Sequence, residues 1–203
     1  MHALLYDERR QANQTNFVKK RCLPMNEVQL VLLVQSGDRS AFDELLRNVY
    51  PALLRYAGGL VGASAADDIV QDAAIQVHRK LKWLREPSCF RPWAFRIVSR
   101  LAFAYLKRDR RWSSFEEFEG TETRFVAEES VESNVMWSSQ LQYLANEVSP
   151  ASRAVLLLHY QDGLLLEEIA AVLEVPLGTV KSRLSYGLTQ VRRKLERKGP
   201  DGN

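Results

Sequence analysis

The sequence predicts an all-α protein: two small helical domains joined by a flexible acidic linker, the second with a helix-turn-helix. Apolar residues recur at helical spacing through most of the chain, and no segment alternates with the period of a β-strand. A length of 203 residues leaves room for one or two domains. Charge is unevenly divided, because residues 26–112 carry a net +5, residues 113–139 carry −6 and residues 140–203 carry +1.

The composition excludes several other classes of protein. With 46% hydrophobic and 26% charged residues, the chain is neither wholly disordered nor collagen-like. No run approaches the roughly 20 apolar residues that span a bilayer, so no membrane insertion is expected. Two cysteines, Cys22 and Cys89, and three scattered histidines form no disulfide framework or metal-ligand spacing. We therefore expect no metal, no cofactor and a reducing, cytoplasmic location.

Residues 1–25 are expected to form a flexible N-terminal arm, because they are polar and lack the apolar segment of a signal peptide. Met1 and Met25 both fit as the start residue. The first domain is expected at 26–112. Its first helix begins at Asn26, a good capping residue, and ends near Gly37.

Three further helices complete the first domain. One starts at the capping box Ser40–Asp43, contains Pro51 as a candidate kink, and ends at Gly58-Gly59. The next starts at Ser64–Asp67. Its buried stripe comprises Ile69, Ala73, Val77, Leu81 and Leu84. Pro92 suits the first turn of the last helix, which runs to about residue 108.

The acidic linker is expected at 113–137, the second domain at 138–198 and a short tail at 199–203. In the second domain, Ser149-Pro150 opens a helix that ends at Gly163. Two short helices at 166–173 and 177–184 follow, separated by Glu174-Val175-Pro176. This is the plan of a helix-turn-helix.

The second helix of this motif presents groups that suit duplex DNA. Ile169, Leu173, Val180 and Leu184 are expected to face the core. The polar residues on the free side are Thr179, Lys181, Ser182, Arg183 and Ser185. Such side chains donate to phosphates and to base edges in the major groove, and Arg192 and Arg193 further along add backbone contacts. The alternative is a helical hairpin with a solvated basic end.

The last helix of the first domain carries basic and aromatic residues on one face. They are Trp93, Arg96, Arg100, Phe103 and Lys107, at spacings of three and four. Aromatic and guanidinium planes stack on bases while cations follow phosphates, so the stripe favours single-stranded DNA. Trp93 fits a core position equally well.

The helix before it has an acidic face. If Ile69, Ala73 and Val77 point inward, the opposite side presents Asp67, Asp68, Gln71, Asp72 and Ile75. One apolar residue among polar ones suits a docking patch for a protein partner. Alternatively, the face is merely solvated and the first aspartates favour the helix N-terminus.

These motifs together resemble a known family. The run from residue 164 to 195 is similar to the promoter-reading C-terminal domain of bacterial RNA polymerase sigma factors of the extracytoplasmic-function (ECF) type. Asp67-Asp68-Ile69-Val70-Gln71-Asp72 resembles the family's acidic helix, which docks on the clamp helices of the largest polymerase subunit. The similarity covers residues 26–111 and 138–197.

The resemblance implies a non-catalytic subunit that binds core RNA polymerase and promoter DNA, with an anti-sigma protein as the partner that holds it inactive. The helix-turn-helix would read the minus-thirty-five element, and the aromatic–basic helix with the loop 85–91 would capture the melted minus-ten strand. The loop adds the candidate contacts Arg85, Ser88, Phe90 and Arg91.

Three positions depart from the family pattern. Arg100 stands where Asn is common, and Ala104 where Asp is common. Glu174 replaces the usual Gly of the turn, at a cost of roughly 1–2 kcal/mol if the backbone there has positive φ. The usual Ser or Thr cap of the first motif helix is also replaced, by leucines at 164–166.

Two other functions compete with a sigma factor. A helix-turn-helix regulator acting without polymerase docking would need no strand-opening surface, so the aromatic–basic helix argues against it. An enzyme with a DNA-binding tail would need catalytic groups. The chain shows no Gly-rich phosphate loop, metal-ligand cluster or nucleophile–base arrangement. His159, on an otherwise apolar helix, fits a satisfied core or boundary residue better than a catalyst.

Overall fold

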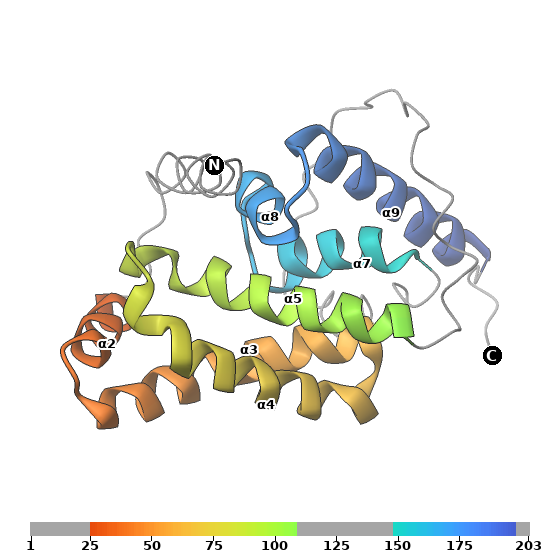
Figure 1. Cartoon of the computed structure of the whole chain (residues 1–203). Coiled ribbons are helices and arrows are strands. Elements are labelled where there is room, and N and C mark those ends of the chain that lie inside the picture. The colour runs from red at the N-terminus through yellow and green to blue at the C-terminus, as the bar shows by residue number, and fades with distance from the viewer. Residues whose placement is uncertain (1–24, 109–147, 198–203) are drawn as a thin grey trace, which may run out of the picture.

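A computed structural model describes residues 25–108 and 148–197 of the chain. Every regular element in these two ranges is helical, as predicted (Figure 1). Nearly all of the predicted N-terminal arm, the acidic linker and the C-terminal tail lie outside the described residues. Within the described ranges, no helix is long and apolar enough to cross a membrane.

Within residues 25–108, the first domain has four α-helices and two short 3₁₀ turns. These are α2 (Met25–Gln35), α3 (Arg39–Val61), α4 (Ala63–Lys80), the 3₁₀ turns η1 (Leu81–Trp83) and η2 (Pro87–Cys89), and α5 (Phe90–Arg108). Helices α3 and α4 lie side by side, and α5 runs across both (Figure 1). Gly62 reverses the chain between α3 and α4 with a φ of 86°, which a residue with a Cβ rarely adopts.

The helices were predicted correctly, but three of their caps were not. Asn26 lies inside α2, which already includes Met25. Helix α3 is capped by Asp38, whose carboxylate accepts the N–H groups of Ser40 at 2.9 Å and Ala41 at 3.3 Å. Ser40 is therefore inside the first turn. Helix α4 follows Gly62 directly, without a capping side chain, so Ser64 is also inside its helix.

Gly58-Gly59 does not end α3, contrary to the sequence prediction. The helix continues to Val61 and includes Pro51. Gly59 instead permits a close approach between the two domains, because a Cβ at this position would lie 2.6 Å from Cδ1 of Leu157. A glycine at a helix contact and a glycine at a helix end look alike in sequence.

The second domain consists of α7 (Pro150–Leu156), the π-helical turn η4 (Leu157–Gln161), α8 (Leu166–Leu173) and α9 (Leu177–Arg197). Ser149 caps α7 by accepting the N–H of Ser152, and Pro150 occupies the first turn. Gly163, with a φ of 68°, follows the end of η4. The predicted start and stop of this helical segment are confirmed.

A large apolar core runs through both domains, and a smaller cluster of Val148, Leu156 and Val191 lies within the second. The five consecutive residues Ala154–Leu158 are fully buried, so the α7–η4 segment is covered on all sides. Leu156 faces Gly187 of α9, while Leu157 faces Gly59 of α3. Helix α8 packs against α5. The two predicted domains are therefore present, but in the described structure they pack against each other.

The Gly59 contact predicts opposite effects for two adjacent glycine substitutions. Gly59→Val should destabilise the protein by about 1–3 kcal/mol, because the added methyl groups overpack against Leu157. Gly58→Ala is the matched control. Its Cβ would meet only Ala66 Cβ at 4.0 Å, so it should stabilise the helix by roughly 0.5–1 kcal/mol.

Urea denaturation would measure the two stabilities, and small-angle X-ray scattering would measure the radius of gyration. We expect Gly59→Val to increase the radius and Gly58→Ala to leave it unchanged. Equal stability and equal dimensions for the two variants would contradict the assigned domain contact.

Candidate polymerase and nucleic-acid interfaces

The acidic face of α4 is exposed as predicted. Ile69, Ala73 and Val77 are buried in the core. The opposite side of the helix exposes Asp67, Asp68, Gln71, Asp72 and Ile75. Half of the Ile75 side chain is accessible, which is a large exposure for an apolar residue surrounded by aspartates.

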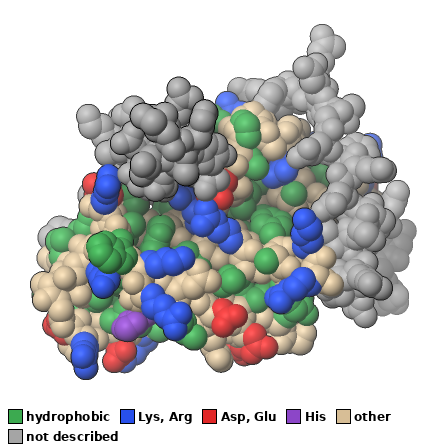
Figure 2. Space-filling model, viewed as in Figure 1, with side chains coloured by type: hydrophobic (Ala, Val, Ile, Leu, Met, Phe, Trp, Pro, Cys, Tyr) green, Lys and Arg blue, Asp and Glu red, His purple; other side chains and the backbone are tan. Residues whose placement is uncertain are grey.

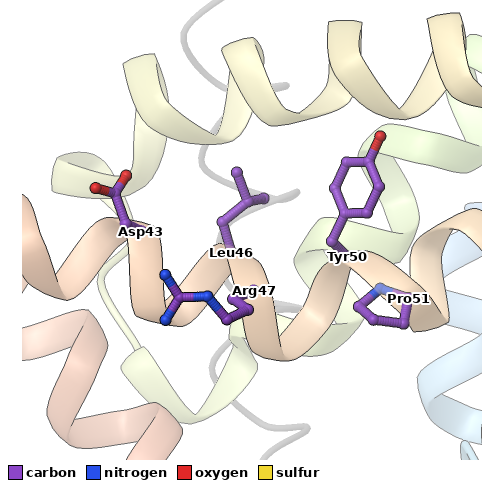
Figure 3. A pocket seen from close by; sticks show the side chains of 5 residues that line it. All are labelled: Asp43, Leu46, Arg47, Tyr50 and Pro51. Carbon is purple, nitrogen blue, oxygen red and sulfur yellow. The ribbon is translucent and has the colours of Figure 1, made fainter.

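A hollow of about 370 Å³ lies beside this face, lined by α3 residues Asp43, Leu46, Arg47, Tyr50 and Pro51 (Figure 3). Leu46 and Tyr50 point towards α4. The Tyr50 hydroxyl donates to Asp67 Oδ1 at 3.4 Å. The hollow and the acidic face are therefore adjacent parts of one exposed surface.

The aromatic–basic stripe is present on α5 but is unevenly exposed. Arg100 and Lys107 are exposed, whereas Trp93, Arg96 and Phe103 are half-buried. Trp93 and Phe103 pack against the core, and the Trp93 ring lies 6.3 Å from that of Phe90. Trp93 thus supports the core and retains some accessible surface, and its contact with a DNA strand stays a prediction.

Two loop residues predicted to contact DNA, Phe90 and Arg91, make contacts within the first domain. Phe90 is fully buried, so it cannot reach a strand in this arrangement. The Arg91 Nε donates to both carboxylate oxygens of Glu27, at 2.9 and 3.0 Å, and Glu27 is only 3% exposed. Arg85 is exposed, and the Ser88 hydroxyl donates to Glu86 Oε1 at 2.7 Å.

An ion pair joins the two domains at the stripe. Arg100 Nη2 lies 2.6 Å from Glu174 Oε1, and Arg100 Nε lies 3.2 Å from Oε2. Glu174 has a φ of 57°, which confirms that its position in the turn needs positive φ. The pair connects two of the departures from the family pattern. Because both side chains are partly exposed, it contributes about 0–1 kcal/mol, less than the apolar packing of α8 on α5.

The helix-turn-helix has the predicted packing. Ile169 and Val180 are fully buried, and Leu173 and Leu184 pack against the core. The missing Ser or Thr cap is partly replaced by Glu168, whose carboxylate accepts the Leu165 N–H at 2.7 Å.

The polar residues of α9 differ in accessibility. Lys181, Arg192 and Arg193 are exposed. The residues Thr179, Ser182, Arg183 and Ser185 are half-buried. The Ser182 hydroxyl donates to the Thr179 carbonyl at 3.0 Å, which leaves its lone pairs available to a DNA donor. Lys and Arg side chains also spread over the face of the molecule shown in Figure 2.

Sequence reasoning missed a partly buried carboxylate, that of Asp162, near the domain contact. Burial raises the pKa of Asp162 to about 7, against the opposing influence of Arg55, of the Gln161 side-chain hydrogen bond and of Arg91. Arg55 and Arg91 belong to the first domain. Nothing in the sequence around Asp162 indicates burial, because it directly precedes the glycine that ends a helix.

The remaining reactive side chains have structural environments. Burial raises the pKa of the Cys89 thiol to about 11, which disfavours the nucleophilic thiolate. His159 Nδ1 lies 3.0 Å from the Leu164 carbonyl oxygen, consistent with the predicted boundary role. In the described ranges, no group of three or more His, Cys, Asp or Glu side chains is arranged to hold a metal ion.

Comparison with known protein families agrees with this architecture. Residues 45–112 match the family described as Sigma-70 region 2, and residues 138–191 match Sigma-70, region 4. The ECF RNA polymerase sigma-E factor of Escherichia coli K12 is 30% identical over 165 residues, 76% of this chain and 86% of that protein. The sigma-E factor of Haemophilus influenzae Rd is 26% identical over 185 residues, 85% and 96% of the two chains.

Two solved structures share the fold. CnrH, in complex with the cytosolic domain of CnrY, has a TM-score of 0.63 and 20% identity, covering 86% of this chain and 99% of that one. The sigma factor RpoE from Bartonella quintana, in complex with the anti-sigma factor NepR, has a TM-score of 0.59 and 23% identity. That match covers 76% of this chain and 96% of RpoE.

A helix-turn-helix packed on a helical domain with an acidic face and an aromatic–basic helix defines a sigma-70-type transcription factor, with regions 2 and 4. The chain belongs to the ECF family of RNA polymerase sigma factors. It is therefore a non-enzymatic protein that directs promoter-specific transcription initiation with RNA polymerase. This result sets aside the regulator acting without polymerase and the enzyme.

Asp162 predicts a pH-dependent stability. Because its folded pKa is raised above the usual value of 3.8, the contribution of Asp162 to stability is fully present below about pH 4 and is lost as the pH rises through about 7. Asp162→Asn cannot ionise. Its stability relative to the wild type should therefore be higher at pH 8 than at pH 5 by about 1–3 kcal/mol.

Urea denaturation of both proteins at the two pH values would measure this difference. Asp43→Asn, at an exposed position on α3, is the control and should show little pH-dependent effect. An Asp162→Asn effect of the same size at both pH values would rule out a charged Asp162 as the cause.

Proposed function

We propose that this ECF sigma factor uses three separate surfaces during initiation. The observation that carries the assignment is the division within one domain, where α4 exposes an acidic face and α5 a basic and aromatic one. Because α4 and α5 pack in one domain, the protein-docking surface and the strand-binding surface keep a fixed position relative to each other. The helix-turn-helix of the second domain supplies the third surface.

Polymerase docking is assigned to Asp67, Asp68, Gln71, Asp72 and Ile75. All five are exposed, and their backbone is fixed by the buried side of α4. Charged and polar groups around one accessible apolar side chain fit a protein interface better than a merely solvated helix.

Capture of the melted minus-ten strand is assigned to α5 and the loop before it. The proposed contacts are Arg85, Ser88, Trp93, Arg96, Arg100, Phe103 and Lys107. Stacking on half-buried rings and contacts from cations to phosphates support this assignment. Phe90 and Arg91 are assigned to holding the loop, because one is buried and the other is paired with Glu27.

Reading of the minus-thirty-five duplex is assigned to α9. The proposed contacts are Thr179, Lys181, Ser182, Arg183, Ser185, Arg192 and Arg193. The N-terminal part of the second helix of such a motif enters the major groove.

The packed arrangement must open at a promoter. Two elements about two DNA turns apart are separated by roughly 70 Å. A compact body of this size is roughly 35–40 Å across, so the packed domains cannot reach both elements at once. We assign the packed form to the protein without promoter, with Arg100 held by Glu174.

We further propose that the protein acts in the cytoplasm and that an anti-sigma protein regulates it. The solved complex of RpoE with NepR supports the second assignment, since a chain of the same fold binds such a partner there. RNA polymerase and its template are cytoplasmic in bacteria, which supports the first.

Ile75 tests the docking surface. Ile75→Arg should weaken binding to core RNA polymerase more than tenfold, because it places a charge at the accessible apolar centre of the patch. Leu32→Arg is the matched control, since Leu32 is exposed to 51% on α2 and lies outside the proposed interfaces. Binding would be measured by fluorescence anisotropy and transcription by run-off assays. If Ile75→Arg bound polymerase and supported transcription as well as the wild type, the assignment of polymerase docking to α4 would be wrong.

A second pair of variants separates base reading from backbone binding on α9. Arg183 and Arg192 are about 13 Å apart along the helix axis, too far to share a base pair. Arg183→Ala should change which minus-thirty-five bases are preferred, at roughly 1–3 kcal/mol of discrimination. Arg192→Ala should weaken all promoters similarly and reduce the salt slope by about one.

Both variants would be measured on a set of promoter variants and by salt-dependent holoenzyme binding. In the opposite pattern, Arg183→Ala would lower the activity of every promoter equally and Arg192→Ala would alter base preference. That result would contradict the placement of the N-terminal part of α9 in the major groove.

A further inference from the structure

Charge changes sign along α4 and the turn that follows it. Residues 63–77 include three aspartates and no basic residue, whereas residues 78–85 include Arg79, Lys80, Lys82 and Arg85 and no acidic residue. All four cations are exposed. Figure 2 shows acidic side chains gathered over part of α4, with Lys and Arg side chains on the neighbouring surface. The acidic part has a proposed role, but the basic part, apart from Arg85, has none so far.

Trp83 lies within this basic segment and is 72% exposed, more than any other large apolar side chain of the described ranges. Its neighbours in sequence differ, because Leu81 is fully buried and Leu84 packs against the core. Lys82 Nζ lies 4.9 Å from the centroid of the Trp83 ring. A cation on one face of the ring leaves the other face available for stacking.

A single exposed apolar residue alone would need no explanation, but the backbone that carries Trp83 is held unusually firmly. The Gln35 side chain donates to the Leu81 carbonyl at 3.1 Å and to the Leu84 carbonyl at 2.7 Å. The Leu84 N–H also bonds the Leu81 carbonyl at 3.0 Å. Gln35 thus fixes both ends of the turn whose apex is Lys82-Trp83.

Helix α2 holds the other end of the same loop through Glu27 and Arg91, 2.9 Å apart. The segment 81–91 is therefore anchored to α2 at its beginning and at its end. A ring presented on a fixed backbone loses little conformational entropy on binding, which favours a binding role over a chance exposure.

The surrounding charge distinguishes between two kinds of partner. A protein interface favours an aromatic residue with few charges at its centre. Here Lys82 lies over the ring, and the exposed residues Arg79, Lys80 and Arg85 are close in sequence. An aromatic ring with cations nearby is the combination that binds single-stranded nucleic acid, with bases on the ring and phosphates on the cations.

We propose that Trp83, together with Lys82 and Arg85, forms a second stacking platform that binds an unpaired base of the melted promoter strand beside the loop 85–91. This inference rests on the proposed function, since it extends the strand-binding surface from α5 to η1. Gln35 is a positioning residue for this platform.

The test uses holoenzyme reconstituted from the full chain and core RNA polymerase. Its probe is a single-stranded promoter oligonucleotide with 2-aminopurine placed at successive positions across and beside the minus-ten element. Trp83→Ala should weaken strand binding about 5- to 100-fold and abolish fluorescence quenching at one position. Trp83→Phe keeps an aromatic ring and should restore most of the strand affinity, which a purely structural role would not explain.

Leu33→Ala is the matched control, because Leu33 is a 45% exposed apolar residue on α2 that is not part of the proposed platform. Gln35→Ala should give a smaller loss at the same probe position as Trp83→Ala. Polymerase affinity should be unchanged in all variants.

Three outcomes would overturn the proposal. The first is unchanged strand binding by Trp83→Ala, and the second is an equal loss of strand affinity in Trp83→Ala and Trp83→Phe. The third is a loss of polymerase affinity in place of strand affinity. The last would assign the ring to a protein interface. Failure of the wild-type holoenzyme to bind the strand would instead reject the proposed function of the first domain, so the two failures are distinguishable.

Discussion

The burial of the α7–η4 segment governs the arrangement of the molecule. Five consecutive residues of this segment, Ala154–Leu158, have no solvent contact, so it needs apolar neighbours on every side. Helix α9 covers one side at Gly187, and α3 covers another at Gly59. Burial of a single leucine contributes about 1.5–3 kcal/mol, more than the exposed ion pair between the domains. Apolar packing therefore determines the domain arrangement, and electrostatics adjusts it.

This packing also determines which surfaces remain available. Helix α5 is covered by α3 and α4 on one side and meets α8 on another, which places Arg100 against Glu174. The acidic face of α4 and the turn with Trp83 take no part in the Arg100 contact, and both are exposed. A chain in this arrangement can thus present the face proposed for polymerase docking while part of the stripe proposed for strand binding is occupied.

The sequence was sufficient for the helices, the helix-turn-helix and the exposed face of α4, because helical periodicity is a local property. The sequence was not sufficient where the local pattern fitted two structural roles equally well. Asp38 and Ser40 are both capping residues, and the backbone geometry selected the first. Phe90 in a basic loop could stack on DNA or enter the core, and only the tertiary packing places it inside. The contact at Gly59 involves residues almost one hundred positions apart, which no single-sequence pattern encodes.

The pairing of Arg100 with Glu174 couples two positions that family comparison treats separately. An αL glutamate costs roughly 1–2 kcal/mol in its turn, while a partly exposed ion pair returns at most about 1 kcal/mol. A lineage that restored glycine at 174 would relieve the backbone cost and simultaneously remove the partner of Arg100. The two sites should therefore covary during evolution, with the glutamate retained chiefly in chains that carry a basic residue at position 100.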